Sequence, residues 1–85
     1  MREQKLPPEY SRKADKYLSG LDRKHEQRIK KAIEKLPDGN VMPLEGIVDS
    51  FRLRVGGWRI IFSWINDEQV FIEKISPRGD VYKGV

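Results

Sequence analysis

The sequence FRLRVGGWRIIF at residues 51–62 determines the expected fold, because it reads as two β-strands joined by a two-residue turn. Apolar residues alternate with other residues on both sides of Gly56-Gly57. With these two glycines as the loop, Arg54 lies directly opposite Arg59. Since successive side chains in a strand point to opposite faces, one face of the hairpin is apolar and predicts a core made of Phe51, Leu53, Val55, Trp58, Ile60 and Phe62.

The other face of this hairpin is rich in arginine. It carries Arg52, Arg54 and Arg59, together with Ile61 and Ser63. Two like charges directly opposite each other destabilise a strand pair, so a sheet that keeps them indicates an anionic partner. Several guanidinium groups on one surface suit phosphate. The pattern alone is equally compatible with an outer sheet face that is simply exposed to water.

Length and composition exclude several classes of protein. With 85 residues, the chain is expected to form one domain spanning residues 1–85. It has no cysteine, which excludes disulfides and cysteine-ligated metals. The only histidine, His25, lies within a predicted helix, which disfavours zinc enzymes and hydrolases with a serine–histidine pair. No cofactor-binding motif is visible, and we expect no cofactor.

Charge and hydropathy indicate the expected environment. The net charge of +4, from 17 basic and 13 acidic residues, favours polyanionic partners such as RNA, DNA or an acidic protein. No apolar run is long enough to span a membrane, and the N-terminal sequence MREQKLPPEY has no apolar signal region. We therefore expect a cytoplasmic protein without membrane contacts.

The segment before the hairpin predicts a short strand followed by two helices. Residues 2–6 are expected to form an edge strand that Pro7-Pro8 ends, with Pro8 suited to a first helical turn. Apolar residues at helical spacing predict a first helix that stops at Gly20. The second helix is expected from about Arg23 to Leu36, after Asp22 as its N-cap. Its apolar stripe comprises Ile29, Ala32, Ile33 and Leu36.

The segments around and after the hairpin complete the predicted architecture. Residues 37–49 are expected to be a loop, 69–75 a third strand, and 81–83 a short extended segment. Helices followed by strands favour an α+β domain. We predict a short N-terminal strand and a helical hairpin packed on a three- to four-stranded antiparallel sheet.

Four short sequences carry a resemblance to a known family. They are PLEG at 43–46, FRLRV at 51–55, GWRIIF at 57–62 and DVY at 80–82. In this order, after a helical hairpin, they resemble the RelE/ParE superfamily of bacterial toxins from type II toxin–antitoxin systems. The resemblance covers nearly the whole chain and is most specific from Leu44 to Lys83. It implies the same α+β fold.

The resemblance also implies a choice of activities. RelE-like toxins cut mRNA in the ribosomal A site, and some cleave RNA with little dependence on the ribosome. ParE-like toxins inhibit DNA gyrase and perform no RNA chemistry. In both branches a cognate antitoxin covers and silences the toxin. The RelE-like branch implies the antitoxin, the ribosome and mRNA as partners.

The family's site residues transfer to five positions in this sequence. Arg52 and Arg54 occupy the paired basic positions before the hairpin turn, and Arg59 occupies the arginine that follows the hairpin aromatic residue. Arg78 matches a basic position before the last strand, and Tyr82 matches that strand's tyrosine. Pro77 stands where several members carry a histidine that acts as a general acid, so a histidine mechanism is not available.

Metal-free RNA cleavage requires attack of the 2′-OH on the adjacent phosphorus, with a base, an acid and stabilisation of the phosphorane charge. Arginines suit the last role but are poor general bases, since they stay protonated. Tyr82 is expected to stack on a base, orient the 2′-OH or relay a proton. Glu45 and Glu73 are candidate bases that the sequence does not place.

Ribosome-dependent mRNA cleavage is the function that this arginine-rich face favours. A ParE-like gyrase inhibitor is the alternative, and a nucleic-acid-binding module without catalysis is a third. Individual residues also have simpler structural interpretations. Tyr82 suits packing of the final strand, Trp58 and Trp64 suit the core, and His25 suits a helix surface. Tyr10, Tyr17 and Leu18 suit the core or an antitoxin contact, and Lys30, Lys31 and Lys35 suit a solvated helix face.

Overall fold

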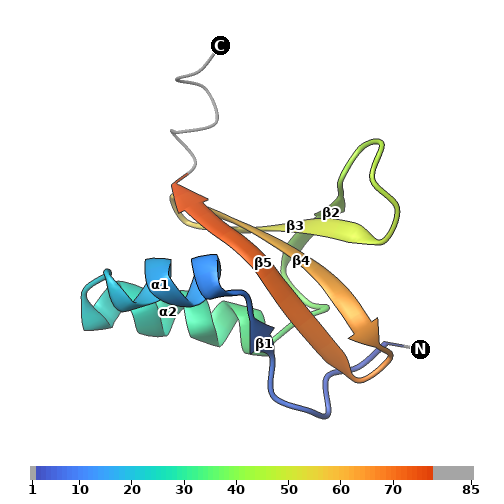
Figure 1. Ribbon diagram of the computed structural model, residues 1–85, viewed down its shortest axis with the longest axis horizontal. Helices are drawn as coiled ribbons and strands as arrows, with labels where there is room; N and C mark the ends of the chain where they lie inside the picture. The colour runs from blue at the N-terminus through green and yellow to red at the C-terminus, as the bar shows by residue number, and fades with distance from the viewer. Residues whose placement is uncertain (1, 78–85) are drawn as a thin grey trace.

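A five-stranded sheet with two helices on one face makes up the part of the protein that the structure describes (Figure 1). The computed structural model describes residues 2–77. Its elements are β1 (Glu9–Tyr10), α1 (Arg12–Ser19), α2 (Arg23–Glu34), β2 (Asn40–Pro43), β3 (Ser50–Val55), β4 (Trp58–Asn66) and β5 (Gln69–Pro77). The strand order is β1-β5-β4-β3-β2, with β1 parallel to β5 and the other neighbours antiparallel. The predicted α+β class is confirmed, although the sheet is mixed and has five strands rather than three or four.

The central hairpin has the predicted register. Val55 pairs with Trp58, Arg54 with Arg59 and Phe51 with Phe62. The turn depends on Gly56, whose φ of 53° lies in the left-handed region that favours glycine. A Cβ at Gly56 would also lie 2.9 Å from the Arg28 Nη2 atom, so the end of the exposed Arg28 side chain would have to shift.

The core lies between the helices and the inner face of the sheet. As predicted, Ile29, Ile33 and Leu36 are buried against the hairpin, whereas Ala32 is only half-buried. Phe51 and Trp58 share the apolar face but remain partly exposed. The buried core also includes residues of α1 and β5. Its members are Ala14, Leu18, Ile29, Ile33, Leu36, Leu53, Val55, Ile60, Phe62, Val70, Ile72 and Ile75.

A β-bulge in β5 changes which residues of that strand face the core. Phe62 pairs with Ile72, but the preceding Ile61 pairs with Lys74, so Glu73 is an extra residue. Regular alternation from Ile72 would turn Lys74 inward and Ile75 outward. With the bulge, Ile75 is buried and Lys74 is exposed. Burial of an isoleucine in place of a lysine is the physical reason for the irregularity.

Residues 2–6 do not form the predicted strand. This segment runs along the β4–β5 turn, where the Glu3 and Lys5 backbone N–H groups donate to the Asp67 and Glu68 carbonyls. Gln4 caps the end of α2, since its Nε2 donates to the Ile33 and Leu36 carbonyls at 2.7 and 3.0 Å. The first strand forms only after the two prolines, as the two residues of β1.

Helix α1 begins later than predicted because Ser11, rather than the Pro8 region, starts it. The Ser11 Oγ accepts a hydrogen bond from the Ala14 N–H at 3.0 Å, as an N-cap does. The same Oγ donates to the Glu73 carbonyl at 2.7 Å, which joins the start of α1 to the bulge in β5. The predicted stop at Gly20 and the Asp22 N-cap of α2 are confirmed.

The predicted loop at residues 37–49 contains an unpredicted strand. Strand β2 pairs with β3, with Met42 opposite Arg52 and Asn40 opposite Arg54. It is an edge strand, and Pro43 lies at its end, where a missing N–H is tolerated. The extended segment predicted at 81–83 lies outside the described residues. Neither helix within residues 2–77 is long and apolar enough to cross a membrane.

Tyr10 makes the stability of the folded protein depend on pH in the alkaline range. Burial, together with the carboxylates of Glu34 and Asp15, raises the pKa of Tyr10 to about 12 from its usual 10.0. A raised folded-state pKa contributes stability that is present below pH 10 and is lost as the pH rises toward 12. The difference in unfolding free energy between wild type and Tyr10→Phe should therefore be constant below pH 9 and shift in favour of Tyr10→Phe above pH 10. Urea unfolding across this range measures it, and a pH-independent difference would contradict the assignment.

Candidate anion-binding site

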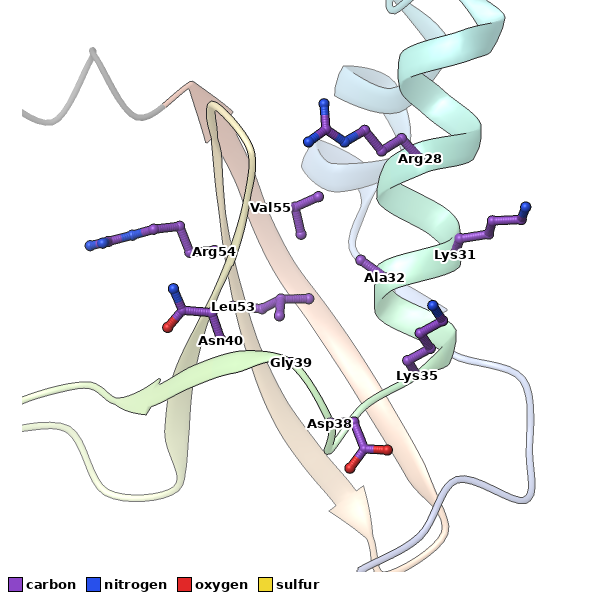
Figure 2. A pocket seen from close by; sticks show the side chains of 10 residues that line it. All are labelled: Arg28, Lys31, Ala32, Lys35, Asp38, Gly39, Asn40, Leu53, Arg54 and Val55. Atoms are coloured by element: carbon purple, nitrogen blue, oxygen red, sulfur yellow. The ribbon is translucent and has the colours of Figure 1, made fainter.

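Strands β3 and β4 place three arginines on the outer face of the sheet. Arg54 pairs directly with Arg59, and Arg52 pairs with Ile61. All three arginines are half-buried. Figure 2 shows Arg54 directed away from α2, whereas its neighbours Leu53 and Val55 point toward the helix. The structure thus brings Arg52, Arg54 and Arg59 together on one surface, which we call the arginine face.

Arg54 and Arg59 are not neutralised by the residues that the structure describes. Within residues 2–77, neither forms an ion pair, and the Nε atom of each is buried without a hydrogen-bond partner. Buried, unsatisfied donors on cationic groups are costly and call for an explanation. An anion bound by the terminal nitrogens would offset both charges, and the opposed geometry allows two strands to hold one phosphate.

Arg52 lies on the β2 side of the arginine face. Its Nη2 atom donates to the Met42 Sδ atom, 2.9 Å away on the neighbouring strand. A thioether is a weak acceptor, so this contact orients the guanidinium without neutralising it. Met42 therefore belongs to the same surface, which β2 extends beyond the predicted hairpin.

Lys74 is a further cation on this face that the hairpin pattern does not indicate. Lys74 of β5 pairs with Ile61 of β4, and Ile61 pairs on its other side with Arg52 of β3. Ser76 pairs with Arg59 and adds a hydroxyl beside the arginine pair. Lys74 reaches this face only because of the bulge. The sequence signal for the bulge is Ile75, an apolar residue out of phase with Val70 and Ile72.

The candidate acid–base residues do not cluster at the arginine face. Glu45 is exposed in the loop that precedes β3, and the first residue of that strand, Ser50, is itself about 13 Å from Arg54 at 3.3 Å per residue. Glu73 is half-buried in the bulge, next to Lys74. His25 lies on the helical side, 2.9 Å from an Asp22 oxygen and with its ring centroid 5.0 Å from that of Trp58. Glu73 is therefore the candidate base nearest to the arginine face in strand register.

The two tryptophans lie on the core face, as predicted. The Trp58 Nε1 atom donates to the Tyr17 hydroxyl at 3.2 Å, and the Arg2 guanidinium lies 5.8 Å from the Trp64 ring centroid. Among residues 2–77, no cluster of three histidine, cysteine, aspartate or glutamate side chains could hold a metal ion. Arg78 and Tyr82 lie outside the described residues.

Comparison with known proteins identifies the fold. No family model and no curated protein sequence matches the chain. Among solved structures, the RelE–RelB complex of Pyrococcus horikoshii OT3 contains a chain that matches with a TM-score of 0.67 and 28% identity, over 93% of this chain and 98% of that one. The RelB–RelE complex of Methanococcus jannaschii gives a TM-score of 0.70 and 19% identity, over 89% and 96%.

The chain has a RelE-like toxin fold. A third match, in the Escherichia coli DinJ–YafQ toxin–antitoxin complex, has a TM-score of 0.66 and 18% identity, over 88% of this chain and 94% of that one. The near-complete coverage in both directions means that the fold expected from the four short sequences is confirmed along the described chain. At these sequence identities, the comparison supports a shared RelE-like fold. The chemistry depends on this chain's own residues.

The opposed arginines should weaken the sheet in the absence of a ligand. Replacing Arg59 with glutamine should raise the free energy of unfolding by about 0.5 kcal/mol at low salt, because a like-charge cross-strand pair is removed. The gain should shrink in high salt, which screens the repulsion. A double-mutant cycle with Arg54→Gln isolates the pair. The same cycle between Arg59 and the exposed Lys16 of α1 should show no coupling. Equal coupling in both cycles would rule out a specific pair.

Proposed function

We propose that this protein is the toxin of a type II toxin–antitoxin system and that it cuts mRNA in the ribosomal A site. The observation that carries the proposal is the arginine face, where Arg54 and Arg59 oppose each other with no counter-ion among the described residues. The RelE-like fold supports the toxin assignment, since the matching chains come from toxin–antitoxin complexes. By the same likeness we propose a cognate antitoxin as a partner.

The proposed reaction needs no metal. The 2′-oxygen of the substrate bonds to the adjacent phosphorus, and the bond from phosphorus to the 5′-oxygen breaks, which leaves a 2′,3′-cyclic phosphate and a 5′-hydroxyl. Negative charge develops on the non-bridging oxygens as the phosphorane forms. Arg52, Arg54 and Arg59 stabilise that charge, and they do so from fixed positions on adjacent strands.

Two proton transfers remain for other groups, since arginine stays protonated. One proton leaves the 2′-OH, and one reaches the departing 5′-oxygen. Tyr82 is the proposed group for orienting or relaying a proton, and Arg78 is the proposed further phosphate contact, both by their match to the family's positions. This sparse acid–base equipment suits an enzyme whose substrate is held in reactive geometry by the ribosome.

Arg59 should be the most costly single loss for cleavage. Its removal leaves only one guanidinium group of the Arg54–Arg59 pair, and loss of one preorganised donor typically costs about 10²–10³ in rate. Arg59→Ala should therefore lose cleavage while remaining folded, and Arg59→Lys should recover only part, because lysine lacks the bidentate fork. Primer extension on programmed ribosomes measures the cutting, and circular dichroism confirms the fold.

The exposed Arg23 at the start of α2 provides the matched control. Arg23→Ala makes the same chemical change away from the arginine face and should cut at the wild-type rate. A folded Arg59→Ala protein that cuts as fast as wild type would contradict the proposal. Intact mRNA with inhibited gyrase would instead support the ParE-like alternative.

Lys74 should contribute to the same site, because the bulge places it on the arginine face. Lys74→Gln should lower kcat/KM for cleavage by about tenfold, the effect of one lost charge-assisted contact of about 1.5 kcal/mol. Lys74→Arg should retain most of the activity. Lys13→Gln, which removes an exposed lysine from α1, should have no effect. Equal losses for Lys74→Gln and Lys13→Gln would mean that only the net charge matters.

A further inference from the structure

Phe71 places an aromatic ring on the outer face of the sheet, away from the core. Its neighbours in β5, Val70 and Ile72, are fully buried, so strand alternation turns Phe71 to the opposite face. Phe71 pairs with Ser63 of β4, which pairs on its other side with Ser50 of β3. The ring is half-buried and does not pack against the core. Neither helix covers this face of the sheet (Figure 1).

The bulge at Glu73 brings Phe71 onto the same face as Lys74. Residues three apart in a regular strand point to opposite faces, but the extra residue puts these two on the same side. Phe71 therefore lies on the arginine face. Ile61 is its diagonal neighbour on β4, at a separation of about 7–8 Å that aromatic side chains can bridge. Because Ile61 pairs with both Arg52 and Lys74, the ring adjoins a row in which an apolar residue stands between two cations.

This mixture of apolar and cationic side chains exceeds what a phosphate alone requires. A single apolar residue on a surface is ordinary, but Phe71 and Ile61 are neighbours and lie directly beside Arg52 and Lys74. Among residues 2–77, no other aromatic ring contacts Phe71. The side chains next to it across the sheet are those of two serines, which are short. The outer face thus offers an aromatic surface next to the cations.

We propose that Phe71 forms a nucleobase subsite, in which one base of a single-stranded RNA stacks on the ring while a neighbouring phosphate lies between Arg52 and Lys74. A nucleotide presents a flat apolar surface beside negative charge, which matches the ring and the two cations. Sheets that carry aromatic residues among basic ones bind single strands in this manner.

The inference rests on the proposed function in one respect, because that function makes RNA the ligand. It adds a contact to the base, whereas the arginines contact the phosphates that every sequence shares. Stacking tolerates all four bases, since each has a π-face. The subsite therefore distinguishes a strand that carries bases from a bare backbone, rather than one sequence from another.

The test uses the full chain and two probes that cannot be cleaved. One is a short fluorescein-labelled adenylate oligonucleotide with 2′-O-methyl sugars, which have no free 2′-OH to attack the phosphorus. The other is an abasic chain with the same sugars, label and number of phosphates. Fluorescence anisotropy measures the affinity of both probes for wild type and for Phe71→Leu, which keeps an apolar side chain but removes the ring. Circular dichroism checks that each protein is folded.

Wild type should bind the adenylate probe about tenfold more tightly than the abasic probe, a difference of about 1.4 kcal/mol. Phe71→Leu should lose most of this preference and bind the abasic probe as wild type does. Phe71→Trp should restore the preference, because any aromatic ring can stack on a base. The matched control is Phe51→Leu, which makes the same change on the core face, where Phe51 stacks on Phe62 with ring centroids 5.5 Å apart. It should retain the wild-type affinity for both probes.

The ring signals of phenylalanine locate the bound base. The chain has three phenylalanines, and Phe51 and Phe62 both lie on the core face. In protein with ¹³C-labelled phenylalanine rings, the adenylate probe should shift the Phe71 signals and leave those of Phe51 and Phe62 in place. The abasic probe should shift the Phe71 signals much less.

Three results would overturn the inference. They are equal affinity of wild type for the two probes, a wild-type preference retained by Phe71→Leu, and Phe71 signals that stay in place at saturation with the adenylate probe. The probes are inert, so these readouts are independent of RNA cleavage. A protein that prefers the adenylate probe through Phe71 but leaves mRNA intact would contradict the nuclease and support the subsite. Cleavage of mRNA by a protein without this preference would contradict only the subsite.

Discussion

Burial of the apolar face of the β3–β4 hairpin against the two helices is the constraint on which the rest of the structure depends. Because side chains alternate strictly along a strand, this burial fixes the register of the hairpin. A slip by one residue would bring arginines into a core that contains Ile29 and Ile33. The same constraint holds Arg54 opposite Arg59 on the outer side. The arrangement that stabilises the fold therefore also creates an unfavourable charge pair, and an anionic substrate would relieve it.

The hairpin follows from the sequence because its signals are local. The two glycines, the alternation on both sides and the arginines at regular intervals each point to the same register. The helix stop at Gly20 and the Asp22 N-cap are equally local and are confirmed. Features that depend on distant partners were not predictable. Ser11 caps α1 while bonding to Glu73, which is 62 residues away, and Gln4 caps α2 from outside any regular element.

The candidate site likewise combines features with local sequence signals and features that depend on tertiary contacts. The three hairpin arginines meet as the pattern predicts, whereas Lys74 and Met42 reach the arginine face through tertiary effects. Lys74 does so because burying Ile75 requires a bulge, and Met42 does so because β2 forms in a segment whose proline and glycine content indicates a loop. Arg78 and Tyr82 rest on the family resemblance alone.

The central claim is that Arg54 and Arg59 together bind one RNA phosphate. Its most direct measurement is the Nε–Hε signals of the arginine side chains in ¹⁵N-labelled protein, titrated with a dinucleotide that carries a 2′-deoxy sugar at the scissile position and so cannot react. The account predicts that the Arg54 and Arg59 signals move together and saturate at one ligand per chain, while the signal of Arg28, on the other side of the sheet, stays in place. Saturation that leaves the Arg54 and Arg59 signals unmoved, or equal movement of every arginine, would contradict it.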